Sequence, residues 1–219
     1  MPQIHDWFLS ELAAEQRRLS RRGVISGSFK VAAGAALALS FASVPSIRRL
    51  ALAQELKSDL DVLNYALTLE HLEYAFYRDG VGLFTFGEDS RGQSIDDNFA
   101  AIRDHEGEHV TTLTTVITDL GGTPVEEARY DFGAAYDDPV AFMQTAMALE
   151  NTGVSAYDGA GQFLTNPDLL TAAGTIVAVE ARHASDLNLL NGEVPFPAAF
   201  ETPLAPEKVL EIAGPFIAA

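Results

Sequence analysis

The sequence VEARHASDL, residues 179–187, places Glu180 three positions before His183 in a segment that otherwise has the apolar pattern of a buried helix. The sequence DHEGEHVTTL, residues 104–113, repeats this spacing with Glu106 and His109. Residues three positions apart lie on one face of an α-helix, so each pair directs a carboxylate and an imidazole the same way. One such pair is weak evidence of a site, but two pairs on separate helices need a common explanation.

Two further segments carry a second repeated pattern. Glu70 is followed seven residues later by Tyr77, and Glu150 is followed seven residues later by Tyr157. Seven residues at 3.6 per turn return to nearly the same helix face. The chain therefore reads twice as Glu, Tyr and Glu-x-x-His, with an offset of 80 residues for the first two positions and 74 for the others. This repetition predicts a duplicated helical hairpin whose two halves pack against each other.

The apolar spacing predicts four long helices, at about residues 56–78, 97–120, 138–164 and 166–191. Asp138 and Asn166 suit helix N-caps because each precedes a proline, and Gly121 suits a helix end. No strand-like alternation of comparable length is present. We therefore expect an all-α domain over residues 54–219, an up-down four-helix bundle with a long crossover between its second and third helices.

The last segment, residues 193–219, is rich in proline and contains one short predicted helix at about residues 206–212. We expect this C-terminal extension to wrap the outside of the bundle, anchored by Phe196, Phe200 and Phe216.

A bundle with this symmetry brings four glutamates and two histidines to one central point. Without a cation, several buried carboxylates would repel one another, at a cost of several kcal/mol each, or would take up protons. Two divalent cations would neutralise the four carboxylates. Oxygen and imidazole ligands favour iron or manganese, while zinc is less favoured but remains possible through its affinity for imidazole. The predicted metal ligands are Glu70, Glu106, His109, Glu150, Glu180 and His183.

The chain contains no cysteine. This excludes disulfides, iron–sulfur clusters and thiolate zinc sites.

The predicted site takes one Glu from each of two helices and Glu-x-x-His from each of the other two. This arrangement resembles that of the ferritin-like di-iron carboxylate proteins. The Glu-to-Tyr spacing resembles the rubrerythrin-type bundles. The tail FETPLAPEKVLEIAGPFI, residues 200–217, is similar to exported ferritin-like domain proteins related to plant desiccation proteins. The rubredoxin-like cysteine module of rubrerythrin is absent from the sequence, and nothing in it marks a ferritin cage.

This resemblance implies a role for each predicted ligand. Glu106 and Glu180 would bridge two metal ions, the glutamates of the other two helices would be terminal ligands, and each histidine would bind one ion. Tyr77 and Tyr157 would donate hydrogen bonds that orient the carboxylates.

Four residues beside the predicted ligands also need an assignment. Glu73 shares a helix face with Glu70, so it is a possible extra or exchanging ligand, the alternative being a solvated or ion-paired group. His71, His105 and Glu108 point elsewhere on their helices, and we expect them on the surface.

The first 53 residues have the layout of an export signal. Ser20-Arg21-Arg22 is followed by an apolar run at residues 31–44 and by Ala51-Leu52-Ala53, a cleavage-site pattern that completes a twin-arginine-type signal. A single membrane anchor is the alternative, but a run of fourteen residues falls short of the roughly 20 that a bilayer requires. We expect a periplasmic, cell-surface or extracellular protein, with a membrane-retained, uncleaved form as the other possibility.

Residues 54–219 carry 28 acidic and seven basic side chains, a formal net charge of 7 − 28 = −21. Such a surface repels nucleic acids and anionic membranes. The sequence therefore predicts a metal-dependent redox protein acting on O2, peroxide or ferrous iron. The alternatives are a non-catalytic stress or desiccation protein stabilised by its metal and a metal-storage protein, and an oligomer is compatible with each.

Overall fold

The computed structural model describes residues 56–218, and the predicted signal at residues 1–53 lies outside this range. Its four long helices are α2 (Asp59–Gly80), α3 (Ile95–Asp119), α4 (Pro139–Gly161) and α5 (Pro167–Leu190). The short elements are η3 (Gly133–Tyr136), α6 (Pro206–Ala213) and η4 (Gly214–Phe216). Within residues 56–218, β-pairing is limited to two isolated bridges. The prediction of an all-α bundle is confirmed, and the four long helices begin and end within three residues of the expected positions.

The helices begin where their capping side chains predict. Asp138 accepts hydrogen bonds from the N–H groups of Val140 and Ala141, and Asn166 accepts one from Asp168. Ser58 and Ser94 cap α2 and α3 in the same way. These side chains satisfy N–H groups that have no partner within the helix, so the caps fix the start of each helix.

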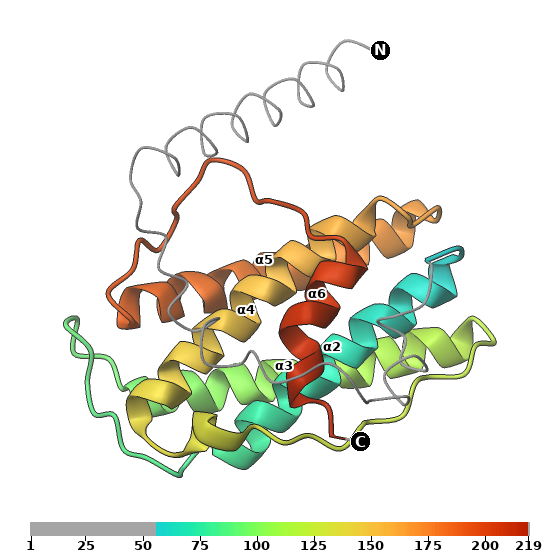
Figure 1. Cartoon of the computed structure of the whole chain (residues 1–219). Helices are drawn as coiled ribbons and strands as arrows, with labels where there is room; N and C mark the ends of the chain where they lie inside the picture. Colours follow the sequence, from blue (N-terminus) through green and yellow to red (C-terminus); the bar gives the residue numbers. More distant parts are fainter. Residues whose placement is uncertain (1–55, 219) are drawn as a thin grey trace.

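The long connection at residues 120–138 runs the length of the bundle, from the end of α3 to the start of α4 (Figure 1). As a result α2 and α4 are antiparallel. At one end of the bundle, Asp59 in α2 accepts hydrogen bonds from the backbone of Thr165 and Asn166 in the α4–α5 loop, at 2.7 and 3.2 Å. At the other end, α2 finishes at Gly80, which lies directly against the ring of Phe142 in α4. A pseudo-twofold axis therefore relates the α2–α3 and α4–α5 hairpins and exchanges the two ends of the bundle.

The two ends are filled differently. Aromatic rings fill the end where α2 finishes at Gly80 and α4 begins, among them Phe76, Phe99 and Phe142. The other end holds a smaller aliphatic cluster around Leu63, Leu113 and Ile176. The predicted ligands lie between these two clusters, near the middle of all four helices.

The C-terminal segment packs across the bundle, as expected, with α6 lying over α4 (Figure 1). The backbone N–H of Leu204 donates to the carbonyl of Ser155 at 2.9 Å, and Gly159 leaves no room for a Cβ beside the Leu204 carbonyl. Phe216 packs against the ring of Phe132 as predicted.

The prediction that Phe196 anchors this segment is wrong, because its side chain is 78% exposed. Phe196 lies between Pro195 and Pro197, where the chain has no regular secondary structure. The buried side chains of Val209 and Ala213 in α6 provide the anchor instead. Phe200 is half-buried.

None of the helices in residues 56–218 combines the length and the apolar character needed to cross a membrane.

Candidate metal centre

The six predicted ligands lie together in the interior, in two groups. Each group contains four residues whose ligand atoms all lie within 4.8 Å of one another, and the groups share Glu106 and Glu180. All four glutamates are fully buried. The arrangement matches the two bridging positions expected from the resemblance, and the assignment of these residues as ligands stays a prediction that this geometry supports. The first group is Glu70, Glu106, His109 and Glu180, and the second is Glu106, Glu150, Glu180 and His183.

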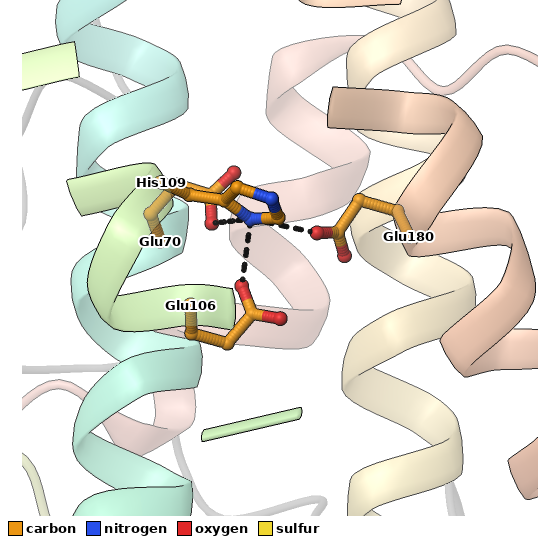
Figure 2. A group of neighbouring side chains, drawn as sticks. All are labelled: Glu70, Glu106, His109 and Glu180. Atoms are coloured by element: carbon orange, nitrogen blue, oxygen red, sulfur yellow. Dashed lines mark hydrogen bonds and ion pairs between the residues drawn. The ribbon is translucent and has the colours of Figure 1, made fainter. Parts of the chain in front are cut away.

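In the first group, one nitrogen of His109 faces three carboxylates (Figure 2). The His109 Nδ1 lies 3.1 Å from Glu70 Oε2, 3.3 Å from Glu106 Oε2 and 3.1 Å from Glu180 Oε1. A ring nitrogen carries at most one hydrogen, so it can donate a full hydrogen bond to only one of these oxygens.

The second group repeats this geometry around His183. Its Nδ1 lies 3.2 Å from Glu106 Oε1 and 3.2 Å from Glu150 Oε2. The two oxygens of Glu106 therefore face different histidines, as a carboxylate that bridges two ions would.

Burial and mutual repulsion shift the pKa values of the carboxyl groups. Burial, together with the charge of Glu180, raises the pKa of Glu106 to about 8, and burial with the charge of Glu150 raises that of Glu180 well above its usual range. Glu70 is the exception: burial would raise its pKa, but hydrogen bonding and charge attraction with His109, together with hydrogen bonds from Glu106 and Tyr157, outweigh burial and lower it. Burial would also lower the pKa of His109, yet its close contacts with the carboxylates of Glu106, Glu180 and Glu70 raise it to about 12. Without metal, the interior must hold protons in place of cations.

The residues present fit a pair of cations. Both oxygens of Glu180 and one oxygen each of Glu106 and Glu150 are buried without a hydrogen-bond partner. Such oxygens normally have one, and a coordinated cation would satisfy them. Ligands that lie about 2.1 Å from a shared ion are themselves roughly 3.0–3.4 Å apart. The nitrogen-to-oxygen distances of 3.1–3.3 Å around His109 agree with this spacing.

Residues 58–193 match the family described as the ferritin-like domain. The chain belongs to the ferritin-like domain family. The match covers all four long helices and all six predicted ligands. No curated protein matches the chain. Family membership confirms the ferritin-like resemblance seen in the sequence.

The two predicted tyrosines reach across to the opposite hairpin. Tyr157 in α4 donates a hydrogen bond to Glu70 Oε1 in α2. Tyr77 in α2 is fully buried near Glu150 in α4, whose charge adds to burial in raising the tyrosine pKa, but its hydroxyl lies outside normal hydrogen-bond geometry. Only one half of the ferritin-like site therefore has its terminal carboxylate held by a phenol.

This difference makes a matched pair of variants informative. We expect Tyr157→Phe to weaken metal binding in the Glu70 half roughly 10- to 100-fold, because an outer hydrogen bond that orients a ligand is lost. Tyr77→Phe should have a smaller effect, since its hydroxyl makes no such bond. Calorimetric titration of each variant with Fe²⁺ under anaerobic conditions measures both affinities. Equal effects from the two variants would contradict this assignment.

Glu73 lies in the interior, so the alternative of a solvated side chain is wrong for it. It is only 3% exposed, and burial followed by the charges of Glu180 and Glu150 raises its pKa well above the usual range. A Cβ on Gly153 would come 2.8 Å from Glu73 Oε1. Gly153 lies 80 residues after Glu73 and is therefore its counterpart in the other half. Because Gly153 has no side chain, the interior has room for the fifth carboxylate, that of Glu73. The Glu73 Oε2 has no hydrogen-bond partner, but neither donor group includes Glu73, so its assignment as an extra ligand stays a prediction.

Sequence reasoning missed two histidine contacts. His71 was expected on the surface but is buried, because the crossover covers it and the carbonyl of Val125 lies 3.3 Å from its Nε2. His105 is exposed, as is Glu108, in agreement with the prediction. However, the His105 Nδ1 lies 2.9 Å from the Nε2 of His183. Both contacts join distant parts of the chain, and local spacing gives no signal of them.

His105 is placed to position His183. A proton on the His183 Nε2 that is donated to His105 leaves the His183 Nδ1 free to bind metal. The equivalent position in the other half, 74 residues later, is Val179. We expect His105→Ala to weaken metal binding at the His183 half about 10-fold, while Val179→Ala leaves both halves unchanged. The same Fe²⁺ titration checks this, and unchanged binding by His105→Ala would exclude the positioning role.

Proposed function

We propose that this chain binds a carboxylate-bridged pair of metal ions, iron or manganese, and uses them in redox chemistry with O2, peroxide or ferrous iron. The observation that carries the proposal is the pair of buried donor groups that share Glu106 and Glu180. One shared carboxylate could arise from packing. Two, with a histidine in each group and four buried oxygens lacking hydrogen-bond partners, favour a dinuclear centre.

Each part of the site has a definite task in this proposal. When bound, iron or manganese supplies the electron exchange with an oxygen species. Glu106 and Glu180 hold the two positions together, and His109 and His183 each complete one of them. The hydrogen bond from Tyr157 fixes the orientation of Glu70. The surrounding helices exclude bulk water, because all four glutamates are fully buried.

We further propose that the protein acts outside the cytoplasm, exported by the twin-arginine route. The support is the sequence of residues 1–53, with Arg21 and Arg22 ahead of an apolar run. The strongly acidic composition of residues 54–219 favours small-molecule substrates and disfavours nucleic acid. The proposal leaves the chain free to act as a monomer or an oligomer.

A second candidate function is a non-catalytic stress or desiccation protein in which the metal stabilises the fold. One observation favours it: the donor groups join all four long helices, so a bound pair of ions would cross-link the whole bundle.

Metal content and turnover together separate these functions. We expect two iron or manganese ions per chain by elemental analysis of the purified protein, with consumption of O2 or peroxide. Turnover should be lost in Glu150→Ala and in His183→Ala. Glu108→Ala is the matched control, because Glu108 is an exposed glutamate on the same helix as Glu106. Bound metal with no turnover on any oxidant would overturn the redox proposal in favour of the structural role, and many more than two ions per chain would indicate storage.

A further inference from the structure

An apolar cavity of about 90 Å³ lies at the end of the bundle where α2 and α5 begin and α3 and α4 end. All four helices line it, chiefly with aliphatic side chains such as Leu63, Leu69, Leu113 and Ile176. Tyr157 forms part of the wall. Since Tyr157 also donates to Glu70, one side chain links the cavity to the candidate metal centre.

The opposite end of the bundle shows why this end is hollow. There, the Phe142 ring stacks on Phe76 with centroids 4.8 Å apart and meets Phe99 edge-on at 5.0 Å. The pseudo-twofold axis relates each of these rings to a smaller side chain at the cavity end. The pairs, from the offsets of 80 and 74 residues, are Phe76 with Ala156, Phe99 with Ala173, and Phe142 with Val62. Val62 and Ala173 line the cavity directly. The cavity therefore occupies the space that aromatic rings fill at the opposite end of the bundle.

The cavity is accessible and offers little to a polar molecule. Among its lining residues, Thr112, Ala172 and Thr175 are exposed, which places an entrance between α3 and α5. The hydroxyl of Tyr157 is engaged with Glu70, and that of Thr175 donates to the carbonyl of Ala172. Tyr65, another lining residue, has a buried hydroxyl without a hydrogen-bond partner. A polar ligand would still lose most of its hydrogen bonds to water, whereas an apolar ligand would lose none.

We propose that this cavity binds a small uncharged hydrocarbon molecule, of the size of one aromatic ring, beside the metal centre. An engineered cavity of about 150 Å³ lined by aliphatic and aromatic side chains stays dry and binds benzene. The present cavity is smaller but open at one side, so a ring can extend into the entrance. Its role as a substrate pocket rests on the proposed function, but its capacity to bind a hydrocarbon does not require metal.

Benzene is a suitable probe, and two variants fill the cavity with the rings of the opposite end. Calorimetric titration of the full chain, both metal-loaded and chelator-treated, should show benzene binding. Val62→Phe and Ala173→Phe should each weaken binding at least 10-fold, because they restore the counterparts of Phe142 and Phe99. Ala178→Phe is the matched control, since Ala178 is exposed on α5 and lies outside the cavity lining, and it should bind benzene as the unchanged chain does.

The result separates the possible occupants. If the unchanged chain does not bind benzene, the proposal is wrong. The cavity would then be filled by another part of the chain or by a second copy, or would stay empty. Equal binding by the filled variants would overturn it as well. Circular dichroism verifies that each variant folds, and Ala173→Phe is the safer of the two because its site is only half-buried. Metal content is measured separately, so an unchanged chain that holds its metal but binds no benzene contradicts this inference and leaves the proposed function standing.

Discussion

Removing the bound metal with a chelator should lower the melting temperature of the purified protein by roughly 10 °C. A ligand held only by the folded state, at about 1,000 times its dissociation constant, adds about 4 kcal/mol to the free energy of unfolding. In a domain of this size each kcal/mol corresponds to about 2–4 °C. Differential scanning calorimetry with and without chelator measures the shift.

The physical reason is the buried charge. The metal-free interior retains Glu70, Glu106, Glu150 and Glu180 with no exposure to solvent, and burial raises the pKa of Glu106 to about 8. The double variant Glu106→Gln with Glu180→Gln is the matched control, because it removes both shared charges while keeping side-chain volume. Its melting temperature should hardly respond to chelator. If elemental analysis shows that metal has left the unchanged chain and the melting temperature stays the same, the centre does not stabilise the fold.

The helices and the candidate ligands could be predicted because their signals are local or repeated. A capping residue such as Asp138 followed by proline fixes a helix start within a few residues of chain. The Glu-x-x-His spacing fixes which side chains share a helix face. Its repetition indicates that both halves direct their ligands to one site. Tyr157 was also predicted to donate to a carboxylate, and it does so to Glu70 in the other half.

The features that escaped prediction depend on contacts between segments far apart in the sequence. The crossover buries His71, which no pattern around it indicates. His105 meets His183 only because α3 and α5 converge at the site. Phe196 was expected to pack because it is aromatic, but apolar character alone does not decide burial in a proline-flanked segment. Long-range packing, which propensity and periodicity do not encode, decided each case.

The duplicated sequence also holds information that appears only when its halves are compared. Glu73 opposes Gly153, and Phe142 opposes Val62, so the two halves use the same framework unequally. One half adds a carboxylate to the interior of the site, and the other leaves an apolar cavity beside it.

Glu180→Ala should abolish measurable binding at both metal positions, whereas Glu150→Ala should abolish it only at the position formed with His183. Glu180 belongs to both donor groups, and Glu150 belongs to one. Loss of an outer hydrogen-bond partner typically costs 10- to 100-fold in metal affinity, so loss of a ligand itself should cost on the order of 100-fold or more. Stepwise Co²⁺ titration, followed by absorption spectroscopy, reports the number of ions bound per chain.

The comparison is well matched, because both side chains are fully buried glutamates and both substitutions leave a similar space. Any general loss of packing should therefore affect the two variants alike, and only the number of ions bound should differ. The expected counts are none for Glu180→Ala and one for Glu150→Ala. One ion retained by both variants would show that Glu180 does not bridge, and Glu106 would then be the carboxylate that joins the two groups.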